Sequence, residues 1–210
     1  MKDHAMKDHT VPNQSVPNQA MPSRAMPNHA LPEGVARPGV PTLKRTTIST
    51  PVGELTLIAS PKGLRAVLWG VDGKAGRLPV DASVDASVVD DDDPILAQAR
   101  RELAEYFDGE RQKFSVALEP IGTSFQQSAW KVLCDIPFGE TINYGEQARR
   151  LGDVKKSRAV GAANGRNPLS IIVPCHRVVG ADGSLTGFGG GIENKAWLLD
   201  HERMVRFRAH

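Results

Sequence analysis

A regular pattern of apolar and polar residues begins at Leu43. Three runs, TLKRTTIST (42–50), GELTLIAS (53–60) and GLRAVLWG (63–70), alternate or are rich in β-branched residues, with PVG and PKG between them. Short runs of this kind, bounded by glycine and proline, are typical of strands joined by tight turns. The pattern predicts an antiparallel meander of three strands.

A helix and a further strand are predicted after the meander. Pro94 opens the segment PILAQARRELAEYFDGE (94–110), which is apolar at helical spacing and ends at Gly109. Proline is favoured at the first helical position, and such a helix can cover one face of the sheet. The segment KFSVALEP (113–120) predicts one more strand. Residues 43–120 therefore predict a small α+β domain, followed by a linker near 120–122.

The remainder of the chain has mostly helical patterns. Thr123 and Gln126 have the spacing of a capping box for SFQQSAWKVLCDIP (124–137). NYGEQARRLG (143–152) predicts a second helix, and after the turn DVKK, Ser157 is expected to cap a third, RAVGAANGR (158–166). Two helices joined by a short turn are the DNA-binding helix-turn-helix arrangement. GIENKAWLLDHER (191–203) predicts a last helix in a domain spanning 121–205, with a short tail at 206–210.

Two segments are repetitive. Residues 1–42 repeat MKDH and VPNQ motifs with frequent proline, which predicts a disordered tail whose histidines form no fixed metal site. VDASVDASVVDDDD (80–93) predicts an acidic surface loop.

Composition restricts the class of protein. With 210 residues, 40% of them hydrophobic, the chain can form one large domain or two small ones. Two cysteines are too few for a disulfide framework, and no apolar run approaches the roughly 20 residues of a membrane span. No signal-peptide core is found near Met1, so we expect no membrane partner and a cytoplasmic location. Net charge is −3 over 43–120 and +4 over 121–210, which permits a polyanionic partner.

The segment 158–166 has unusually small side chains. Ala159, Gly161, Ala162, Ala163 and Gly165 leave much of the surface of the predicted helix nearly bare, and its glycines reduce helix propensity. A bare helix can approach the minor groove of DNA, which is only about 6 Å wide, or can pack tightly against another helix. Arg158 can insert into the base stack beside an extruded base, or it can be an ordinary surface arginine.

Cys175 ends an apolar run in IIVPCHRVVG (171–180), directly before His176. Cysteine attacks as a thiolate, so a reactive cysteine needs a base or positive charge nearby, and a third group must orient an imidazole base. The following helix offers Glu193, Asp200 and Glu202 for that role. Cys175 can equally be a small buried hydrophobe. Cys134 has no nearby histidine and is expected to be structural.

Four motifs carry a family resemblance: INYGEQA (142–148), SRAVGAANGRNP (157–168), IIVPCHRVVG (171–180) and LTGFGGGIENKAWLLDHE (185–202). In this order they resemble the O6-alkylguanine-DNA alkyltransferases, also called methylated-DNA–protein-cysteine methyltransferases, from about Leu43 to Met204. The resemblance implies an α+β fold: an antiparallel sheet with a helix, ribonuclease-H-like, followed by a mostly helical, winged-helix-like DNA-binding domain. It also implies a monomer without a cofactor, and leaves cooperative binding along DNA open.

The resemblance implies roles for single residues. Cys175 would accept an alkyl group from O6-alkylguanine in double-stranded DNA, and the resemblance leaves activity on O4-alkylthymine open. His176 would act as its base through a water, Glu202 would orient His176, and Asn167 would fix the loop. Tyr144 would rotate the base out, and Arg158 would take its place in the stack. Four further residues would contact DNA: Ser157, Ala159, Ala162 and Lys156. The substrate pocket would be lined by Val173, Pro174, Val178, Phe188 and Gly189.

The sequence departs from the family pattern at Phe188, where relatives often have tyrosine. The missing hydroxyl leaves protonation of the departing guanine to Tyr144 and loop amides. No metal-ligand set is found in the first domain, although some relatives hold a structural zinc. Two other classes stay open: a non-catalytic helix-turn-helix DNA binder, and a cysteine hydrolase with many turnovers.

Overall fold

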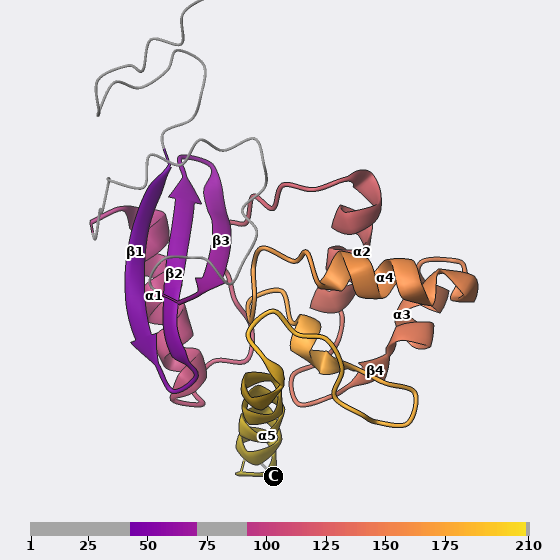
Figure 1. Cartoon of the computed structure of the whole chain (residues 1–210). Coiled ribbons are helices and arrows are strands. Elements are labelled where there is room, and N and C mark those ends of the chain that lie inside the picture. Colours follow the sequence, from indigo (N-terminus) through magenta and orange to yellow (C-terminus); the bar gives the residue numbers. More distant parts are fainter. Residues whose placement is uncertain (1–42, 71–91, 209–210) are drawn as a thin grey trace, which may run out of the picture. The chain divides into compact units, whose positions relative to one another are not determined.

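The structure is a computed structural model that describes residues 43–70 and 92–208. The tail predicted at 1–42 and all but the last two residues of the predicted acidic loop lie outside the described residues. Figure 1 shows the arrangement of the elements along the chain.

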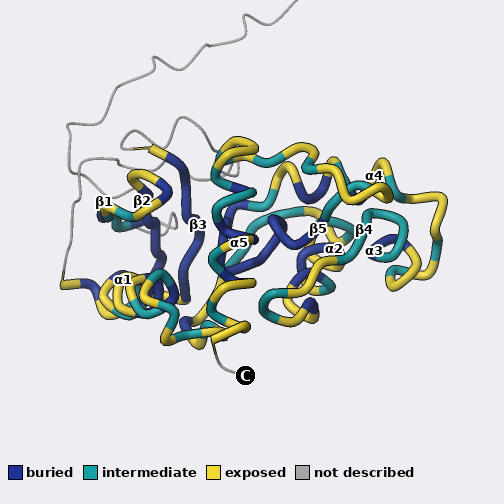
Figure 2. Tube along the Cα trace, turned by 90° about the horizontal axis from the view of Figure 1, so that it is seen from below, coloured by how far each residue is buried: buried dark blue, intermediate teal, exposed yellow. Residues whose placement is uncertain are grey.

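The predicted three-strand meander is confirmed. Strands β1 (Lys44–Thr50), β2 (Gly53–Ser60) and β3 (Gly63–Trp69) pair antiparallel in the order β1-β2-β3. Gly53, with φ at 98°, makes the turn into β2 because this backbone region favours glycine. Every residue of β3 is buried, whereas β1 is buried at Thr46 alone (Figure 2). Strand β3 is therefore the strand through which the sheet packs against the rest of the molecule.

Helix α1 (Pro94–Phe107) lies across one face of this sheet, as the sequence predicts (Figure 1). Asp93 caps its first turn by accepting hydrogen bonds from the backbone N–H groups of Ile95 and Leu96. The helix ends at Phe107, and Gly109 follows with φ at 80°. The side chains at Leu96, Ala99 and Leu103 are fully buried, so apolar burial fixes α1 to the sheet.

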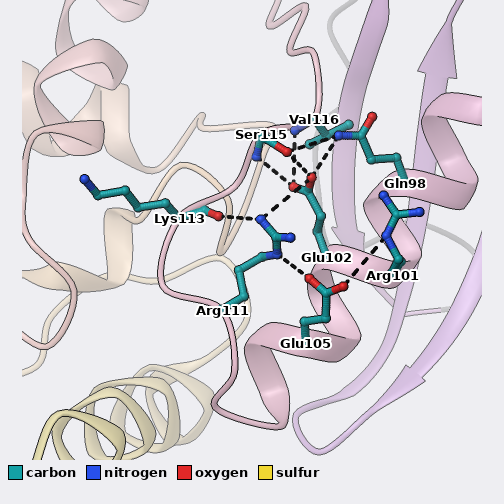
Figure 3. Close-up of polar contacts among 8 residues, drawn as sticks. All are labelled: Gln98, Arg101, Glu102, Glu105, Arg111, Lys113, Ser115 and Val116. Carbon is teal, nitrogen blue, oxygen red and sulfur yellow. Dashed lines mark hydrogen bonds and ion pairs between the residues drawn. The ribbon is translucent and has the colours of Figure 1, made fainter. Parts of the chain in front are cut away.

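The prediction of a strand at 113–120 is wrong. This segment forms an isolated bridge between Leu64 and Leu118. The segment is held instead by the carboxylate of Glu102, which is buried on α1 and accepts hydrogen bonds from Ser115, Val116 and Gln98 (Figure 3). Arg111 bonds to Glu105 and to the backbone of Lys113. Two backbone hydrogen bonds at Leu64, of 2.7 and 2.9 Å, join this segment to β3, and the buried side-chain anchor holds the rest, which an alternating pattern cannot reveal.

The second half consists of short elements with one long helix at its end. In chain order these are α2 (Ser124–Cys134), β4 (Ile142–Asn143), α3 (Tyr144–Arg150), η1 (Val154–Lys156), α4 (Ser157–Asn164), η2 (Cys175–Arg177), β5 (Val178–Val179) and α5 (Ile192–Arg208). The capping box at Thr123 and Gln126 is confirmed. Helix α5 continues to Arg208, beyond the domain end predicted at 205. Strands β4 and β5 pair in parallel, which places Tyr144 beside the chain that follows Cys175.

Helices α3 and α4 form the predicted helix-turn-helix. Gln147 and Asn164 are buried and exchange amide hydrogen bonds of 3.1 and 2.8 Å, which fixes one helix to the other. Trp130 on α2 donates to the backbone oxygen of Ala163 at 2.9 Å. The predicted cap at Ser157 is wrong: Ser157 is the first helical residue, Lys156 stands at the N-cap without a side-chain bond, and the Ser157 hydroxyl donates to Val154. The 3-10 turn η1 before the helix explains the difference.

One apolar core serves both halves of the described chain. It includes Leu57 and Leu64 from the sheet, Leu103 from α1, and Val173 and Leu198 from the second half. No helix in the part of the chain that the structure describes is long and apolar enough to cross a membrane.

Candidate active site around Cys175

The loop before Cys175 is fixed by Asn167. The Asn167 side-chain amide donates to the backbone oxygen of Val173 at 2.7 Å and accepts from the backbone N–H of Leu169 at 3.0 Å. Its Nδ2 also lies 3.3 Å from the sulfur of Cys175. One amide therefore closes the loop and donates to the sulfur that the loop carries.

Ile171 adopts a left-handed backbone conformation in this loop, with φ at 73°. This conformation is an outlier for a β-branched residue, because the branched Cβ is crowded against the backbone. The Ile171 side chain is fully buried, so apolar packing offsets the strain. The turn lets the chain reverse between Asn167 and Cys175, and residues in such conformations cluster at functional sites.

Cys175 begins the 3-10 turn η2 and is 8% exposed. Burial raises the pKa of its thiol, although the Asn167 hydrogen bond and the charge of Lys195 act in the opposite direction. The free protein therefore holds a protonated thiol at neutral pH, and a base is needed to form the thiolate.

His176 and Glu202 form a buried pair beside this cysteine. His176 Nε2 lies 2.8 Å from Glu202 Oε1, and both side chains are fully buried. Arg177 donates to both oxygens of the same carboxylate, at 2.9 and 3.0 Å, and to the backbone oxygen of Ile136. The site therefore has a carboxylate with a permanent cation on one side and an imidazole on the other.

Glu202 is ionised in this setting. Burial acts to raise its pKa, but hydrogen bonds and charges from His176 and Arg177 outweigh burial and bring the pKa to about 2. For His176, burial lowers the pKa, and the hydrogen bond and charge of Glu202 only partly offset it. The imidazole is therefore neutral at neutral pH.

These protonation states assign the imidazole tautomer. An ionised carboxylate only accepts hydrogen bonds, so Nε2 of His176 must carry the proton. Nδ1 is then the basic nitrogen; it is buried and has no hydrogen-bond partner within the described part of the chain. A buried polar atom of this kind ordinarily has a partner, and a small polar group or water is the usual one. The pair is thus arranged to take up a proton at Nδ1.

The exposed face of α4 carries small residues. Arg158, Ala159 and Ala162 are exposed, whereas Val160, Ala163 and Asn164 form the buried face. Ala159 and Ala162 therefore do not serve tight helix packing, which was the other interpretation of the bare helix. Ala163, in contrast, is buried on the face where Trp130 of α2 bonds to the helix backbone. Lys156 is also exposed, and Ser157 is partly exposed.

Phe188 belongs to the loop that follows β5, and Tyr144 at the start of α3 contacts the same loop. The Tyr144 hydroxyl donates to the backbone oxygen of Thr186 at 3.2 Å. The ring of Phe188 is 6.4 Å from that of His176, centroid to centroid. Gly189 is exposed, whereas Val173, Pro174 and Val178 are buried.

Both halves of the chain match family models. Residues 43–120 match the ribonuclease-like domain of 6-O-methylguanine DNA methyltransferase, and residues 124–204 match the DNA binding domain of the same family. A curated relative from Methanosarcina mazei, named methylated-DNA–protein-cysteine methyltransferase, is 43% identical over 155 residues, which cover 74% of this chain and 94% of the relative. The chain belongs to the 6-O-methylguanine DNA methyltransferase family.

Further relatives of this methyltransferase family agree. The protein of the same name from Mycobacterium tuberculosis strain H37Rv is 43% identical over 160 residues, covering 75% of this chain and 90% of the relative. The crystal structure of Mycobacterium tuberculosis OGT in complex with DNA has a TM-score of 0.65 at 41% identity and covers 78% of this chain and 94% of that one. The α+β fold with a ribonuclease-like and a DNA-binding part is thereby confirmed.

Besides Arg177, described above, three residues of this methyltransferase chain contact the site but were missed from sequence. Tyr106 donates to Glu202 at 2.9 Å from α1. Trp69 at the end of β3 contacts Phe188 edge-on at 5.5 Å and donates to Ser170 at 3.2 Å. Lys195 is fully buried and donates to the backbone oxygens of Val178 and Thr186, at 2.6 and 2.8 Å. A lysine that shares a helix face with Leu198 and Leu199 was the one signal in the sequence; nothing there links Tyr106 or Trp69 to Cys175.

A cavity of about 790 Å³ lies behind the loop. Its lining includes Ile172, Pro174 and Arg177 together with Phe114, Cys134 and Phe138. Neither Cys175 nor Phe188 lines it, so this cavity is not the place where a substrate would meet the sulfur.

Proposed function

We propose that the protein repairs alkylated DNA by direct reversal, transferring a methyl or larger alkyl group from O6-alkylguanine in double-stranded DNA to Cys175. The observation that carries this proposal is the buried His176 and Glu202 pair next to Cys175, with an unoccupied basic nitrogen on the imidazole. A protein that only bound DNA would have no need of a thiol, a base and an orienting carboxylate together. Activity on O4-alkylthymine, which has the same alkyl-oxygen bond, stays a prediction.

The chemical step is a single displacement. His176 Nδ1 takes the Cys175 proton through a water molecule, because the thiol is protonated in the free protein. The sulfur then forms a bond to the alkyl carbon as the bond from that carbon to the guanine oxygen breaks. The bonding electrons leave with the guanine, which becomes an anion. With Phe188 in place of tyrosine, we assign the Tyr144 hydroxyl as the donor of the proton that the guanine takes up, while loop amides stabilise the anion by hydrogen bonds. The proton held by His176 then returns to the Tyr144 oxygen through solvent. Glu202 stabilises the imidazolium while it exists.

The product limits the protein to one reaction. A thioether offers water no carbonyl to attack, so the alkyl group stays on Cys175 and each chain reacts once. We assign no cofactor, because thiol, base and leaving group complete the electron and proton balance. The residues of the site come from a single chain, so a monomer is sufficient; cooperative binding along DNA stays a prediction, as does a cytoplasmic location.

Access to the base requires the DNA to open. We propose that the exposed face of α4, with Ala159 and Ala162 flanked by Ser157 and Lys156, lies in the minor groove. Arg158 would fill the gap left by the extruded base, and Tyr144 would push the nucleotide outward. Unstacking a base costs a few kcal/mol, which contacts along this face must offset. The extruded base would be held by the chain around Val173, Pro174, Val178, Phe188 and Gly189.

Intact-mass measurement tests the proposal. The protein is mixed with an excess of duplex DNA containing one O6-methylguanine, and the expected result is a gain of one methyl group per chain, on the peptide that contains Cys175. Cys134→Ser is the matched control, because Cys134 is the other cysteine of the chain, and it should react like wild type. Cys175→Ser should stay unmodified while still binding DNA. A folded wild-type protein that binds the duplex but gains no mass would establish the non-catalytic binder, and many free products per chain would establish a hydrolase.

A further inference from the structure

Tyr106 links the first half of the chain to the base of the reaction. It lies on α1, 96 residues before Glu202, and its side chain is fully buried. Its hydroxyl donates a 2.9 Å hydrogen bond to Glu202 Oε1. This is the oxygen that holds the His176 N–H at 2.8 Å.

The carboxylate of Glu202 is shared among several donors. Oε1 accepts from Tyr106, from His176 and from Arg177 at 3.0 Å, whereas Oε2 accepts from Arg177 and from the backbone N–H of Gly139, both at 2.9 Å. Each additional donor on an oxygen draws off part of its negative charge, so the bond to any one donor weakens. Tyr106 therefore competes with His176 for the same atom.

The tyrosine hydroxyl has no packing reason to be present. The ring contacts Phe107, Phe114, Phe138 and His201 at centroid distances of 5.3 to 6.0 Å, and a phenylalanine would keep these contacts. A buried hydroxyl must be hydrogen-bonded to be tolerated. Burial first, and the Glu202 charge second, raise the pKa of Tyr106 well above its ordinary value, so the hydroxyl stays a neutral donor throughout the working pH range.

We propose that Tyr106 is a positioning residue for alkyl transfer: by hydrogen bonding to Glu202 it tunes how strongly that carboxylate holds His176 and so sets the basicity of the imidazole. This inference rests on the proposed function. The charged groups that act on His176 are Glu202 on α5, Arg177 on the same turn and Lys195 on α5. Tyr106 reaches His176 through Glu202 alone, so its effect must pass through the carboxylate.

Tyr106→Phe tests this positioning role through the pH profile of single-turnover transfer. Without the tyrosine donor, Oε1 holds the imidazolium more strongly, which raises the pKa of His176. The base works in its neutral form and is lost as the pH falls through that pKa, so the acid limb of the profile should move to higher pH. A neutral hydrogen bond of ordinary strength corresponds to a shift of about 0.5 pH unit. The transfer rate on the plateau of the profile should also fall by about five-fold, because the base is less exactly oriented.

His201→Phe is the matched control. His201 Nε2 lies 2.8 Å from the backbone oxygen of Tyr106, so it joins the same two helices, α1 and α5, and its side chain is not among the described donors to Glu202. Its loss should leave the acid limb in place. A merely structural role for Tyr106 would instead slow transfer equally at every pH and lower thermal stability in both variants, and that result would overturn the inference.

A second variant keeps the test decisive if Tyr106→Phe does not fold. Site-specific replacement of Tyr106 by 3-fluorotyrosine keeps the shape and makes the hydroxyl a stronger donor, so the acid limb should move to lower pH. An unmoved limb in this variant would also overturn the inference. If wild type itself transfers no methyl group, the proposed function fails; if wild type transfers normally and neither variant moves the limb, only the role of Tyr106 fails.

Discussion

The exposed face of α4 and the buried cluster around Glu202 differ in how many of their polar groups are hydrogen-bonded within the chain. On α4, Ala159 and Ala162 present little side chain to solvent, and Arg158 has no hydrogen bond or ion pair within residues 43–70 and 92–208. Around Glu202, each carboxylate oxygen has two or more donors and His176 is completely enclosed. The difference indicates that the exposed face of α4 has contacts left to make with a binding partner, whereas the hydrogen bonds around Glu202 are already complete in the free protein.

Glu202→Gln should give the largest effect. A neutral amide leaves the buried Arg177 without a counter-charge, and breaking a buried pair costs about 3 kcal/mol or more in the free energy of unfolding. Glu202 has a lowered pKa, so its carboxylate stabilises the fold above the ordinary pKa of 4.5, and this contribution is lost as the pH falls toward about 2. Urea unfolding at pH 7 and pH 3 measures the difference between wild type and variant, which should shrink at pH 3.

The matched control for this substitution is Asp200→Asn on the same helix. Asp200 pairs with Arg203 in solvent at 3.0 Å, so its loss should change stability by less than about 0.5 kcal/mol. If both substitutions lowered the free energy of unfolding equally, the buried ion pair of Glu202 would contribute no more to stability than an exposed one.

Ala162→Leu should weaken DNA binding without weakening the fold. The position is exposed on α4, and leucine is a good helix former, so thermal stability should stay near wild type. The added side chain would hold the helix away from a minor groove of about 6 Å, and we expect the Kd for duplex DNA to rise by about ten-fold. Fluorescence anisotropy measures it. Ala104→Leu, also exposed but on α1, should bind like wild type; if both variants bind normally, α4 does not enter the groove.

Arg158→Ala should separate base extrusion from chemistry. Only duplex DNA requires a base to leave the stack, so transfer from saturating duplex should slow by several-fold, about ten-fold at most, while transfer from free O6-methylguanine should change little. Arg203→Ala removes an exposed arginine from α5 and should affect neither substrate. Equal slowing on both substrates would remove the extrusion role from Arg158.

Local patterns predicted the elements but not the contacts between them. The meander, α1, the capping box and the helix-turn-helix depend on spacing within a dozen residues, which the sequence displays directly. The anchoring of 113–120 by Glu102, the donation from Tyr106 to Glu202 and the indole of Trp69 beside Phe188 join residues far apart in the chain, so no local pattern could reveal them. The left-handed backbone at Ile171 opposes the intrinsic preference of its residue type, and only tertiary packing enforces it.

The candidate site was found from sequence through motifs that resemble a family, and its detailed roles stay predictions. The nearness of Cys175, Asn167, His176 and Glu202 agrees with the roles expected of them. The division into domains at 43–120 and 121–205 also stays a prediction, because one core contains residues from both segments.

The fluorescence of the tryptophan side chains can report on the steps of the reaction. Of the three tryptophans, Trp130 donates to the backbone of α4, and Trp69 touches the ring of Phe188. Trp130 therefore lies behind the surface that would meet the double helix, and Trp69 lies beside the loop residue Phe188, which we propose contacts the damaged base. Spectra of single-tryptophan versions would separate docking from capture in time, with no dye attached to either molecule.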